Sequence, residues 1–380
     1  MYIQEEQKLV RKTARDFAER VIKPVAQKLD AEEKFDVDIV KQLGELGFFG
    51  MVIPEKYGGK GMSSLSYIIA VEELARVDGS HAATVAAHNS LGIRPIYNFG
   101  TESQRCKYIP PLAKGKGLWA FGLTEPEAGS DSRGTKTTAK LENGKWFLNG
   151  SKIFITNGST PITNGVTVQA VTGKDENGKK IFSTLLLESG TKGFTAKAMK
   201  NKLMWRASDT SELFFDNCEI PEENLLGKID EGSKIMLKTL DSGRLSIAAM
   251  GLGCAQGAYE EALNYAKIRK QFGKPISKFQ VNSFKLADMY VKIELARNYL
   301  YRACWLKDNK QPFAVESAIA KLYCSEVAKE VTDEAVQIHG GYGLIKDYPV
   351  ERFYRDQRLL RIGEGTSEIQ RLVISRHIGC

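Results

Sequence analysis

The sequence predicts a mainly α-helical protein with a small β domain in the middle of the chain. Helical patterns fill residues 1–117 and 229–380, whereas residues 118–228 alternate polar and apolar positions around turn signals. Strands and helices do not alternate along the chain, which argues against a doubly wound parallel sheet. We therefore expect an N-terminal helical domain, a middle β domain and a C-terminal helical domain with these bounds.

The N-terminal block begins with an amphipathic helix. Its apolar residues recur every three or four positions and form one stripe, which comprises Leu9, Val10, Ala14, Phe17, Ala18 and Val21. Two later segments, SYIIAVEELARVD (66–78) and HAATVAAHNSLGIRPIYNF (81–99), are apolar enough to be buried helices. This block is therefore expected to be a layer of packed helices.

The middle block carries hairpin signals. The segment TKTTAKLENGKWFLNGSKIFITNG contains Asn143-Gly144 and Asn149-Gly150 between alternating runs. Asn-Gly in that setting is a strong signal for a two-residue hairpin turn. A further hairpin is expected at ENGKK (176–180), between VTVQAV and IFSTLLLES.

The C-terminal block returns to helices. SFKLADMYVKIELARNYLYRACWLK (283–307) is apolar on most faces, which predicts the central helix of a bundle. GLGCAQG (251–257) resembles a dinucleotide fingerprint, but its spacing is wrong and it lies inside a helical pattern. Its small residues are more simply explained by close packing between helices.

Composition and charge narrow the class of protein. The net charge of +8 comes from basic residues spread along the chain, which favours a diffuse basic surface with local phosphate contacts over nucleic-acid binding. No run of 18 apolar residues indicates a membrane span, and no leader pattern precedes the first helix, so we expect a cytoplasmic protein. The six dispersed cysteines form no CxxC pair and are expected to be reduced thiols.

Several common active-site motifs are missing. The four histidines include no HExxH pair, so we expect no metal site. Neither a GxSxG nucleophile turn nor a phosphate-loop lysine motif occurs.

Three segments could instead surround a flat cofactor. FGLTEPEAGSDSRG (121–134) offers hydroxyl and backbone N–H donors, and KIFITNG (152–158) places Phe154 and Thr156 on one face of a strand. QIHGGYG (337–343) has adjacent glycines that let the backbone approach a diphosphate. Each alone is more often a turn or a core feature.

A fourth segment, RIGEGTSEIQR (361–371), places Glu364 between two glycines just before a helix start. That arrangement suits a carboxylate that reaches into a pocket, and it equally suits a plain turn.

Together these motifs resemble the acyl-CoA dehydrogenase family. EPEAGSD, KIFITNG, RKQFGKPI, QIHGGYG and EGTSEIQR occur in the order and spacing of that family over nearly the whole chain. The resemblance implies an N-terminal helical domain, a middle β-barrel and a C-terminal four-helix bundle. It also implies bound FAD, a homotetramer built as a dimer of dimers, an acyl-CoA substrate and an electron-transferring flavoprotein as redox partner.

The resemblance also assigns binding residues. The expected flavin contacts are Phe121, Leu123, Thr124, Gly129, Ser130, Phe154, Ile155, Thr156, Thr366, Ser367 and Glu368. The expected contacts to the FAD of a neighbouring subunit are Arg269, Gln271, Phe272, Phe279 and Gln280, with Gln337, Gly340 and Gly341 at the adenine side. The expected substrate contacts are Ser130, Asp241, Arg244, Gly365 and Arg376. Without the resemblance, Arg269 could be a solvated charge, and Asp241 and Arg244 an ordinary surface pair.

In the family's reaction, by resemblance, Glu364 is the catalytic base. It would take the Cα proton of an acyl thioester while flavin N5 takes the Cβ hydride. The isovaleryl and long-chain branches place their base on a helix of the C-terminal bundle, and the matching position here is Gly243, which cannot act as a base.

Two positions depart from the family's usual residues. Phe154 stands where Trp is more frequent, and Gly363 stands where short- and medium-chain members have Tyr. Loss of that Tyr would free space beside the base, so we expect a substrate bulkier near Cα and Cβ than a straight short chain, such as a branched, cyclic or aryl-bearing acyl group. With the resemblance to short- and branched-chain members, the expected substrate is a short, branched, cyclic or aryl-bearing acyl-CoA.

Four other functions on this fold remain open. An acyl-CoA oxidase would use the same residues, and only the chain length favours the dehydrogenase. A DNA-binding relative would be expected to carry a further basic domain, and flavin monooxygenases generally lack the glutamate. A non-catalytic acyl-CoA binder would not need a base at Glu364.

Overall fold

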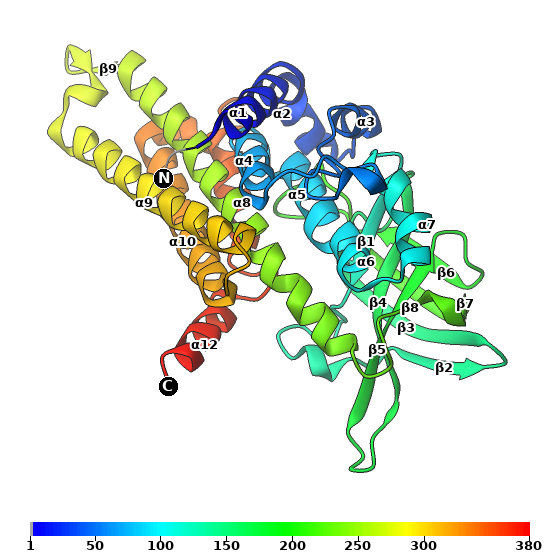
Figure 1. Ribbon diagram of the computed structural model, residues 1–380. Coiled ribbons are helices and arrows are strands. Elements are labelled where there is room, and N and C mark those ends of the chain that lie inside the picture. The colour runs from blue at the N-terminus through cyan, green and yellow to red at the C-terminus, as the bar shows by residue number, and fades with distance from the viewer. Residues whose placement is uncertain (1–2) are drawn as a thin grey trace.

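The computed structural model describes residues 3–380 and confirms the order of helices, strands and helices (Figure 1). The α-helices of the first block are α1 (Glu5–Phe17), α2 (Lys23–Glu32), α3 (Val37–Glu45), α4 (Ser64–Ala75), α5 (Gly79–Ala87), α6 (Ile93–Phe99) and α7 (Glu102–Ala113). Every residue of α4 is buried, as its apolar sequence predicts. On α1 the stripe is narrower than predicted: Val10, Ala14 and Phe17 are buried, but Leu9 is exposed because it lies about 100° round the helix from Val10.

The middle block forms one eight-stranded sheet. Its strands are β1 (Leu118–Gly122), β2 (Thr138–Glu142), β3 (Lys145–Thr156), β4 (Thr163–Lys174), β5 (Lys180–Glu188), β6 (Phe194–Ala198), β7 (Thr210–Pro221) and β8 (Leu225–Leu226). The spatial order is β6-β7-β3-β2-β4-β5-β8, and β1 pairs in parallel with β4. The antiparallel pairing of β4 with β5 confirms the hairpin predicted at residues 176–180.

The two Asn-Gly pairs have different roles. Asn143 and Gly144 both have positive φ, at 49° and 75°, and they turn β2 into β3 as predicted. The hairpin expected at Asn149-Gly150 is wrong, because both residues lie inside β3. Gly150 has a φ of 137° at a shift in the β3–β7 register, where a Cβ would come within 2.7 Å of the Thr137 hydroxyl. This glycine therefore forms a bulge.

The C-terminal block contains the long α8 and the helices around it. Its elements are α8 (Gly232–Ile268), β9 (Lys270–Gln271), β10 (Lys274–Pro275), α9 (Gln280–Asp308), α10 (Ala314–His339), α11 (Val350–Leu360) and α12 (Ser367–His377). On α8, a Cβ at Gly253 or Gly257 would lie 2.2 Å from the Glu72 carbonyl oxygen or 2.1 Å from that of Arg76. The predicted explanation of GLGCAQG as close helix packing is confirmed.

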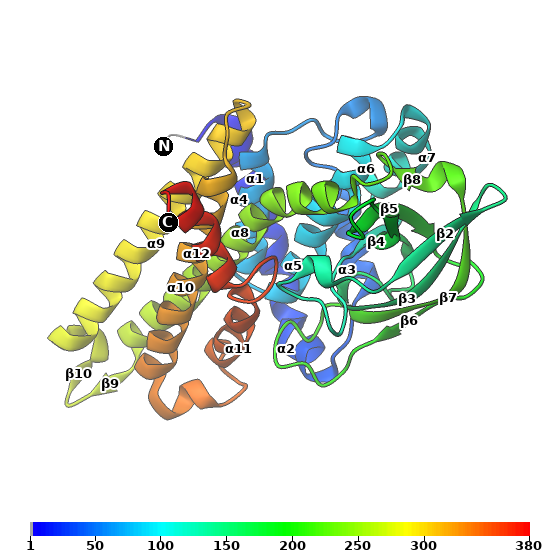
Figure 2. The same cartoon turned by 90° about the horizontal axis from the view of Figure 1, so that it is seen from below.

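The predicted central helix is wrong. The segment 283–307 is part of α9, which lies on the outer side of the bundle (Figures 1 and 2). Its residues Phe284, Val291 and Leu295 are each more than half exposed, whereas α8 is the helix that is buried along most of its length. The apolar character of α9 therefore produces an uncovered face as well as a core face.

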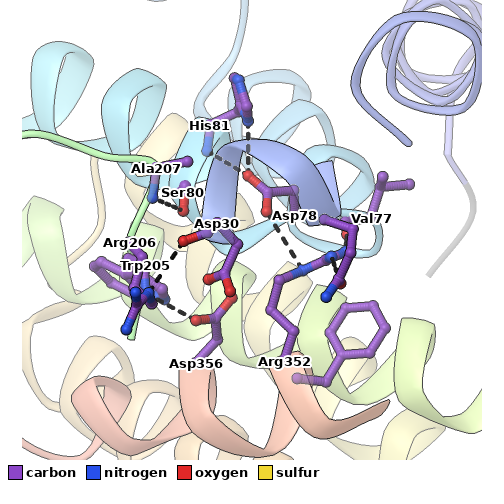
Figure 3. A network of polar contacts seen from close by, with 12 residues as sticks. Asp30, Val77, Asp78, Ser80, His81, Trp205, Arg206, Ala207, Arg352 and Asp356 are labelled. Carbon is purple, nitrogen blue, oxygen red and sulfur yellow. Dashed lines mark hydrogen bonds and ion pairs between the residues drawn. The ribbon is translucent and has the colours of Figure 1, made fainter. Parts of the chain in front are cut away.

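A buried polar network joins the three blocks (Figure 3). Asp78 caps α5 through the backbone N–H of His81, and its other oxygen lies 3.6 Å from the Arg352 guanidinium of α11. Asp356, one turn along α11, accepts a hydrogen bond from the Trp205 backbone N–H at 2.8 Å. Burial raises the pKa of Asp356 to about 7, and the nearby Asp78 charge adds to that rise.

The remaining expectations concern membranes, metals and thiols. None of the helices in residues 3–380 combines the length and hydropathy that crossing a bilayer requires. The same residues contain no cluster of His, Cys, Asp and Glu suited to a metal ion. All six cysteines are free thiols, four of them buried.

Candidate active site

The site is built around the turn between α11 and α12. Glu364 and Gly365 both have left-handed backbone, with φ of 54° and 93°. Such a conformation costs free energy at a non-glycine residue and must be held by its surroundings. Two donors hold it: Lys321 Nζ and Gln370 Nε2 reach the Gly365 carbonyl oxygen at 2.7 and 2.8 Å. Thr366 then caps α12 by accepting from the Ile369 N–H.

The carboxylate of Glu364 lies in a dry environment. The residue as a whole is half-buried, but its Oε2 is inaccessible to solvent and has no hydrogen-bond partner. The burial of this atom decides the electrostatics, because the carboxylate is the group that titrates. Loss of hydration raises the pKa of Glu364 to about 8, against the opposing pull of Lys321 and Arg244.

Gly243 of α8 faces this carboxylate. A Cβ at position 243 would lie 1.7 Å from Glu364 Oε2, a distance at which the two cannot coexist. Only a residue without a side chain at position 243 leaves room for the Glu364 carboxylate, so the glycine at this alternative base position is required for the observed site.

A pair of hydrogen-bonded hydroxyls lies one turn farther along α8. Ser246 follows Gly243 by three residues, so both lie on one face with a rise of about 4.5 Å between them. Tyr67 of α4 donates to the Ala86 carbonyl oxygen at 3.0 Å and therefore accepts from the Ser246 hydroxyl at 2.9 Å. Both hydroxyls are thus engaged in hydrogen bonds within the protein.

The loop after β1 is fastened to β3. Thr124 accepts from the Ile153 N–H at 2.9 Å, and Lys152 Nζ donates to the Leu123 carbonyl oxygen at 3.1 Å and to Glu125 at 2.7 Å. These contacts bring together the two segments that the sequence analysis selected, 121–134 and 152–158. Within the loop, Gly129 and Ser130 are exposed, and a Cβ at Gly129 would meet no atom within 4 Å.

Phe154 has a conformation that the sequence did not predict. The β3–β7 register shifts between Lys152 and Ile155, and Phe154 sits in the resulting bulge with a φ of 61°. Its side chain is 61% exposed, whereas Ile155 is buried. The bulge presents an aromatic ring outward beside the half-buried Thr156.

A second group of predicted residues surrounds a separate hollow. Its volume is about 580 Å³, and its lining includes Arg269, Gln271, Gln337, Gly340 and Gly341. A Cβ at either glycine would meet no atom within 4 Å, so the backbone there is open to a ligand. Beside it, Tyr265 stacks on His339 with ring centres 4.3 Å apart.

The hollow lies far from Glu364 in the same chain. Gly243, which faces Glu364, and Arg269 are 269 − 243 = 26 residues apart, and the helix α8 that carries Gly243 ends at Ile268. At 1.5 Å per residue this separation is about 39 Å. Figures 1 and 2 both place the β9–β10 tip on the side opposite the sheet. Phe272 at this tip is 93% exposed, and its ring lies 6.0 Å from that of Phe279.

Comparisons with known proteins agree with this geometry. Family models described as the N-terminal, middle and C-terminal domains of acyl-CoA dehydrogenase match residues 4–116, 120–218 and 230–379. The short-chain specific acyl-CoA dehydrogenase of Clostridium acetobutylicum is 48% identical, over 98% of each chain. A probable acyl-CoA dehydrogenase of Bacillus subtilis has the same identity and coverage. The chain belongs to the acyl-CoA dehydrogenase family.

Solved structures extend the comparison. The butyryl-CoA dehydrogenase of Megasphaera elsdenii superposes with a TM-score of 0.96 at 44% identity, covering 100% of this chain and 99% of that one. A chain from a structure of the electron transferring flavoprotein of Acidaminococcus fermentans gives the same TM-score at 45% identity and the same coverage. The three-domain fold of the family, predicted from the motifs, is confirmed, and the protein is an oxidoreductase of this family.

FAD is the cofactor of this acyl-CoA dehydrogenase, as predicted. The residues present fit the group. The bulged Phe154 and the loop 121–134 offer an open aromatic and hydroxyl surface, and the open glycines at 340–341 leave room for a diphosphate beside Arg269. About 39 Å of helix separates these two places within one chain.

The structure separates the other predicted contacts into near and distant ones. Asp241 and Arg244 form an ion pair at 2.7 Å beside the base. The Arg244 Nε is buried without a partner, and burial raises the pKa of Asp241.

The other predicted contacts lie at two distances from the base. Phe121, Ser367 and Glu368 are near it, because they flank the loop after β1 and the turn before α12. Arg376 lies in the last turn of α12, and Gln280 begins α9 beside the tip.

Three residues of the site escaped the sequence analysis: Tyr67, Lys321 and Gln370. One signal for Lys321 was available, because it interrupts the small apolar run SAIAKLYCS at a buried position of α10. A lysine at such a position needs a partner. Nothing in the sequence marks Tyr67 or Gln370.

Another cleft, of about 240 Å³, lies over Gly257 between α2, α8 and α11. Two of its cations already have partners, since Lys23 pairs with Glu261 and Arg76 with Glu260. None of the predicted site residues lines it, and we assign it no role in the reaction.

Proposed function

We propose that this acyl-CoA dehydrogenase desaturates a short acyl-CoA thioester between Cα and Cβ, with Glu364 as the base. The observation that carries the proposal is the Glu364 carboxylate: buried, without a hydrogen bond at Oε2, and raised in pKa to about 8. A base with a pKa near the working pH combines availability with strength toward a carbon acid.

The residues around the base have different roles in the proposed reaction. Glu364 Oε2 accepts the Cα proton, and the open space over Gly243 lets the carboxylate lie where it does. The Glu364 backbone N–H makes no hydrogen bond within residues 3–380, so it is available to a developing thioester oxyanion. FAD, when bound, supplies the hydride acceptor. Residues 121–130, with Phe154, Thr156 and Thr366, orient it and exclude water.

The substrate is proposed to be short, with room for a branch. The Tyr67–Ser246 hydroxyl pair lies about one helical turn along α8 from Gly243, which faces the base. The relatives from Clostridium acetobutylicum and Megasphaera elsdenii are described as short-chain specific and butyryl-CoA enzymes. Beside the base, a Cβ at Gly363 would meet its nearest atom, on Leu359, only at 3.7 Å, which supports a branched, cyclic or aryl-bearing acyl group as the alternative.

The assembly is proposed to be a homotetramer, a dimer of dimers with the domains 1–117, 118–228 and 229–380 in each chain. The exposed apolar face of α9 and the exposed Phe272 support it, because both are surfaces that another chain would cover. The long separation of the two cofactor surfaces also supports completion of each FAD site by a second chain. An electron-transferring flavoprotein is the proposed redox partner, and the cytoplasm the proposed location.

The experiment is an anaerobic absorbance titration of the purified holoprotein with butyryl-CoA, 2-methylbutyryl-CoA and cyclohexanecarboxyl-CoA, repeated on Glu364→Gln. We expect butyryl-CoA to bleach the flavin band of the parent, and Glu364→Gln to lower the bleaching rate by roughly 10²–10⁴-fold. Unchanged bleaching in the variant would refute the base, and no bleaching by any thioester would refute the reaction. Admitting air after the titration separates an oxidase, which reoxidises quickly, from a dehydrogenase.

A further inference from the structure

A buried lysine of α10, Lys321, lies next to the turn that carries the base. Lys321 is fully buried, yet it forms no ion pair in residues 3–380. Its Nζ donates instead to the Gly365 carbonyl oxygen, the residue after the base, at 2.7 Å. A lysine ammonium taken out of water without a counter-ion is costly, so this arrangement needs a compensating interaction.

The charges around the turn identify that interaction. Glu364 faces Lys321 from α10, Arg244 from α8 and Tyr67 from α4. The Arg244 charge is partly matched, since Asp241 lies 2.7 Å from it. The Lys321 ammonium is the unmatched cation, and of the acidic groups that act on it, Glu364 has the largest effect, ahead of Glu326 and Glu368.

The other two carboxylates are committed elsewhere or solvated. Glu326 accepts from Arg361 at 3.1 Å and from the Ser367 hydroxyl at 3.0 Å, and Glu368 is exposed. Lys321 is therefore placed to act on Glu364 in two ways, by a hydrogen bond to the strained turn and by its charge.

Resting on the proposed role of Glu364, we propose that Lys321 is a positioning residue for the base: it fixes the left-handed turn through the Gly365 carbonyl, and its charge favours the ionised form of the Glu364 carboxylate. It does so without occupying the carboxylate, because its hydrogen bond goes to the backbone. Oε2 thus remains free for the substrate.

Lys321 should determine the pH at which kcat/KM begins to fall on the acid side. The ammonium favours ionised Glu364, so its removal raises the pKa of the carboxylate and moves the acid limb of kcat/KM to higher pH. Burial lowers the pKa of Lys321 to about 8, so the parent loses this charge above that pH. The effect of removing Lys321 is therefore largest below pH 8 and fades above it.

The test compares pH profiles of kcat/KM for butyryl-CoA in the parent, Lys321→Met and Lys321→Arg. We expect the acid limb of Lys321→Met to lie about one pH unit higher, with a roughly tenfold loss at pH 7. Lys321→Arg keeps the charge and should keep the acid limb close to that of the parent. A loss in Lys321→Met that is uniform across pH would show a merely structural role and overturn the proposal.

Lys202→Met is the matched control. Lys202 is a half-buried lysine whose pKa is also lowered by burial to about 8, and it donates to the carbonyls of Trp205 and Ser208 in the middle block. It should lower thermal stability and leave the acid limb in place.

Two further variants keep the outcomes distinct. If Lys321→Met fails to fold, Lys321→Gln retains a donor without the charge, and its shift relative to Lys321→Arg decides the proposal. Glu364→Gln tests the base itself: if it stays active, the proposed function fails. If it is inactive while Lys321→Gln keeps the parent profile, only the role of Lys321 fails.

Discussion

Two glutamates with buried carboxylates, each with a buried lysine nearby, have pKa values shifted in opposite directions. Glu125 forms a direct ion pair with Lys152 at 2.7 Å and also accepts from the backbone N–H groups of Lys136 and Thr137. Although burial opposes it, this set of donors lowers the pKa of Glu125. Glu364 is left with a bare Oε2, while its lysine is bonded to the backbone, and its pKa is raised to about 8.

A glutamate and a lysine can therefore form either a structural ion pair, as at Glu125 and Lys152, or a catalytic base, as proposed for Glu364. Saturating a carboxylate with donors fixes it as an anion that binds a proton weakly. Withholding the donors while keeping the charge nearby leaves a carboxylate that is ionisable and ready to accept. The position of the lysine hydrogen bond, on the carboxylate or on the carbonyl next to it, separates the two cases.

The largest effect should come from removing the buried ion pair between Glu125 and Lys152. Lys152→Met leaves Glu125 buried as an unpaired anion, and we expect unfolding free energy to fall by about 3–5 kcal/mol at pH 7 in urea titrations. Because the folded-state pKa of Glu125 is lowered, the deficit is fully present above its unfolded pKa. It should shrink as the pH falls and Glu125 becomes protonated.

The double variant Lys152→Met/Glu125→Gln is the control for this prediction. It removes both charges and should recover much of the loss. A single variant within about 1 kcal/mol of the parent would contradict the idea that Glu125 depends on its lysine.

The next effect concerns the space around the base. Gly243→Ala places a Cβ where Glu364 Oε2 now lies, so the carboxylate must move by more than an ångström. We expect kcat to fall by roughly 10²-fold, as misplaced catalytic groups do. Stopped-flow bleaching with butyryl-CoA measures it, and Gly173→Ala, in the sheet with no close atom around its Cβ, is a control that should leave the rate unchanged.

A third buried carboxylate sharpens the comparison. Asp356 resembles Glu364, since one of its oxygens is buried without a partner and its pKa is raised to about 7. The folded protein therefore binds this proton more tightly than the unfolded chain, and stability contributed by the group declines as the pH rises from about 4 to about 7. Asp356→Asn should lack this decline.

The measurement is urea unfolding of the parent and Asp356→Asn at several pH values between 4 and 8. We expect the variant to gain about 3–4 kcal/mol relative to the parent over that range, because the pKa of Asp356 differs by about three units between the folded and unfolded states. A difference that does not change with pH would show that Asp356 is ionised throughout.

The smallest effect is one of selectivity. Gly363→Tyr fills the open space beside the base, where only Leu359 comes near. We expect the ratio of kcat/KM for butyryl-CoA over 2-methylbutyryl-CoA to rise roughly tenfold, the scale of a lost or gained methylene contact. An unchanged ratio would mean that position 363 does not line the acyl pocket.

The sequence was sufficient where local chemistry decides the structure. Asn143-Gly144 ends a strand and starts the next because both residues can take positive φ. The same dipeptide at Asn149-Gly150 became a bulge, because strand β7 continues alongside and supplies pairing on both sides of it. A turn signal reports what a backbone is able to do, and the neighbouring strand decides whether it does so.

In the site, too, local motifs could be predicted from the sequence, whereas contacts between distant segments could not. The motif around Glu364 was visible, but its burial and the space over Gly243 depend on α8 and α10, which are distant in sequence. Phe154 was expected on a regular strand, and the bulge that turns it outward arises from the register with β7. The helix at 283–307 was expected at the centre, because apolar composition does not distinguish a core face from an exposed apolar face.

The hollow at Arg269 and Gly340 has a consequence for how the cofactor is held. In the proposed tetramer each dinucleotide touches two chains, so its affinity and the association of the chains are linked equilibria. Diluting the protein would then release FAD, and adding FAD would drive reassembly. Cofactor loss in a damaged variant would accordingly report on quaternary structure as much as on the residues that line the hollow.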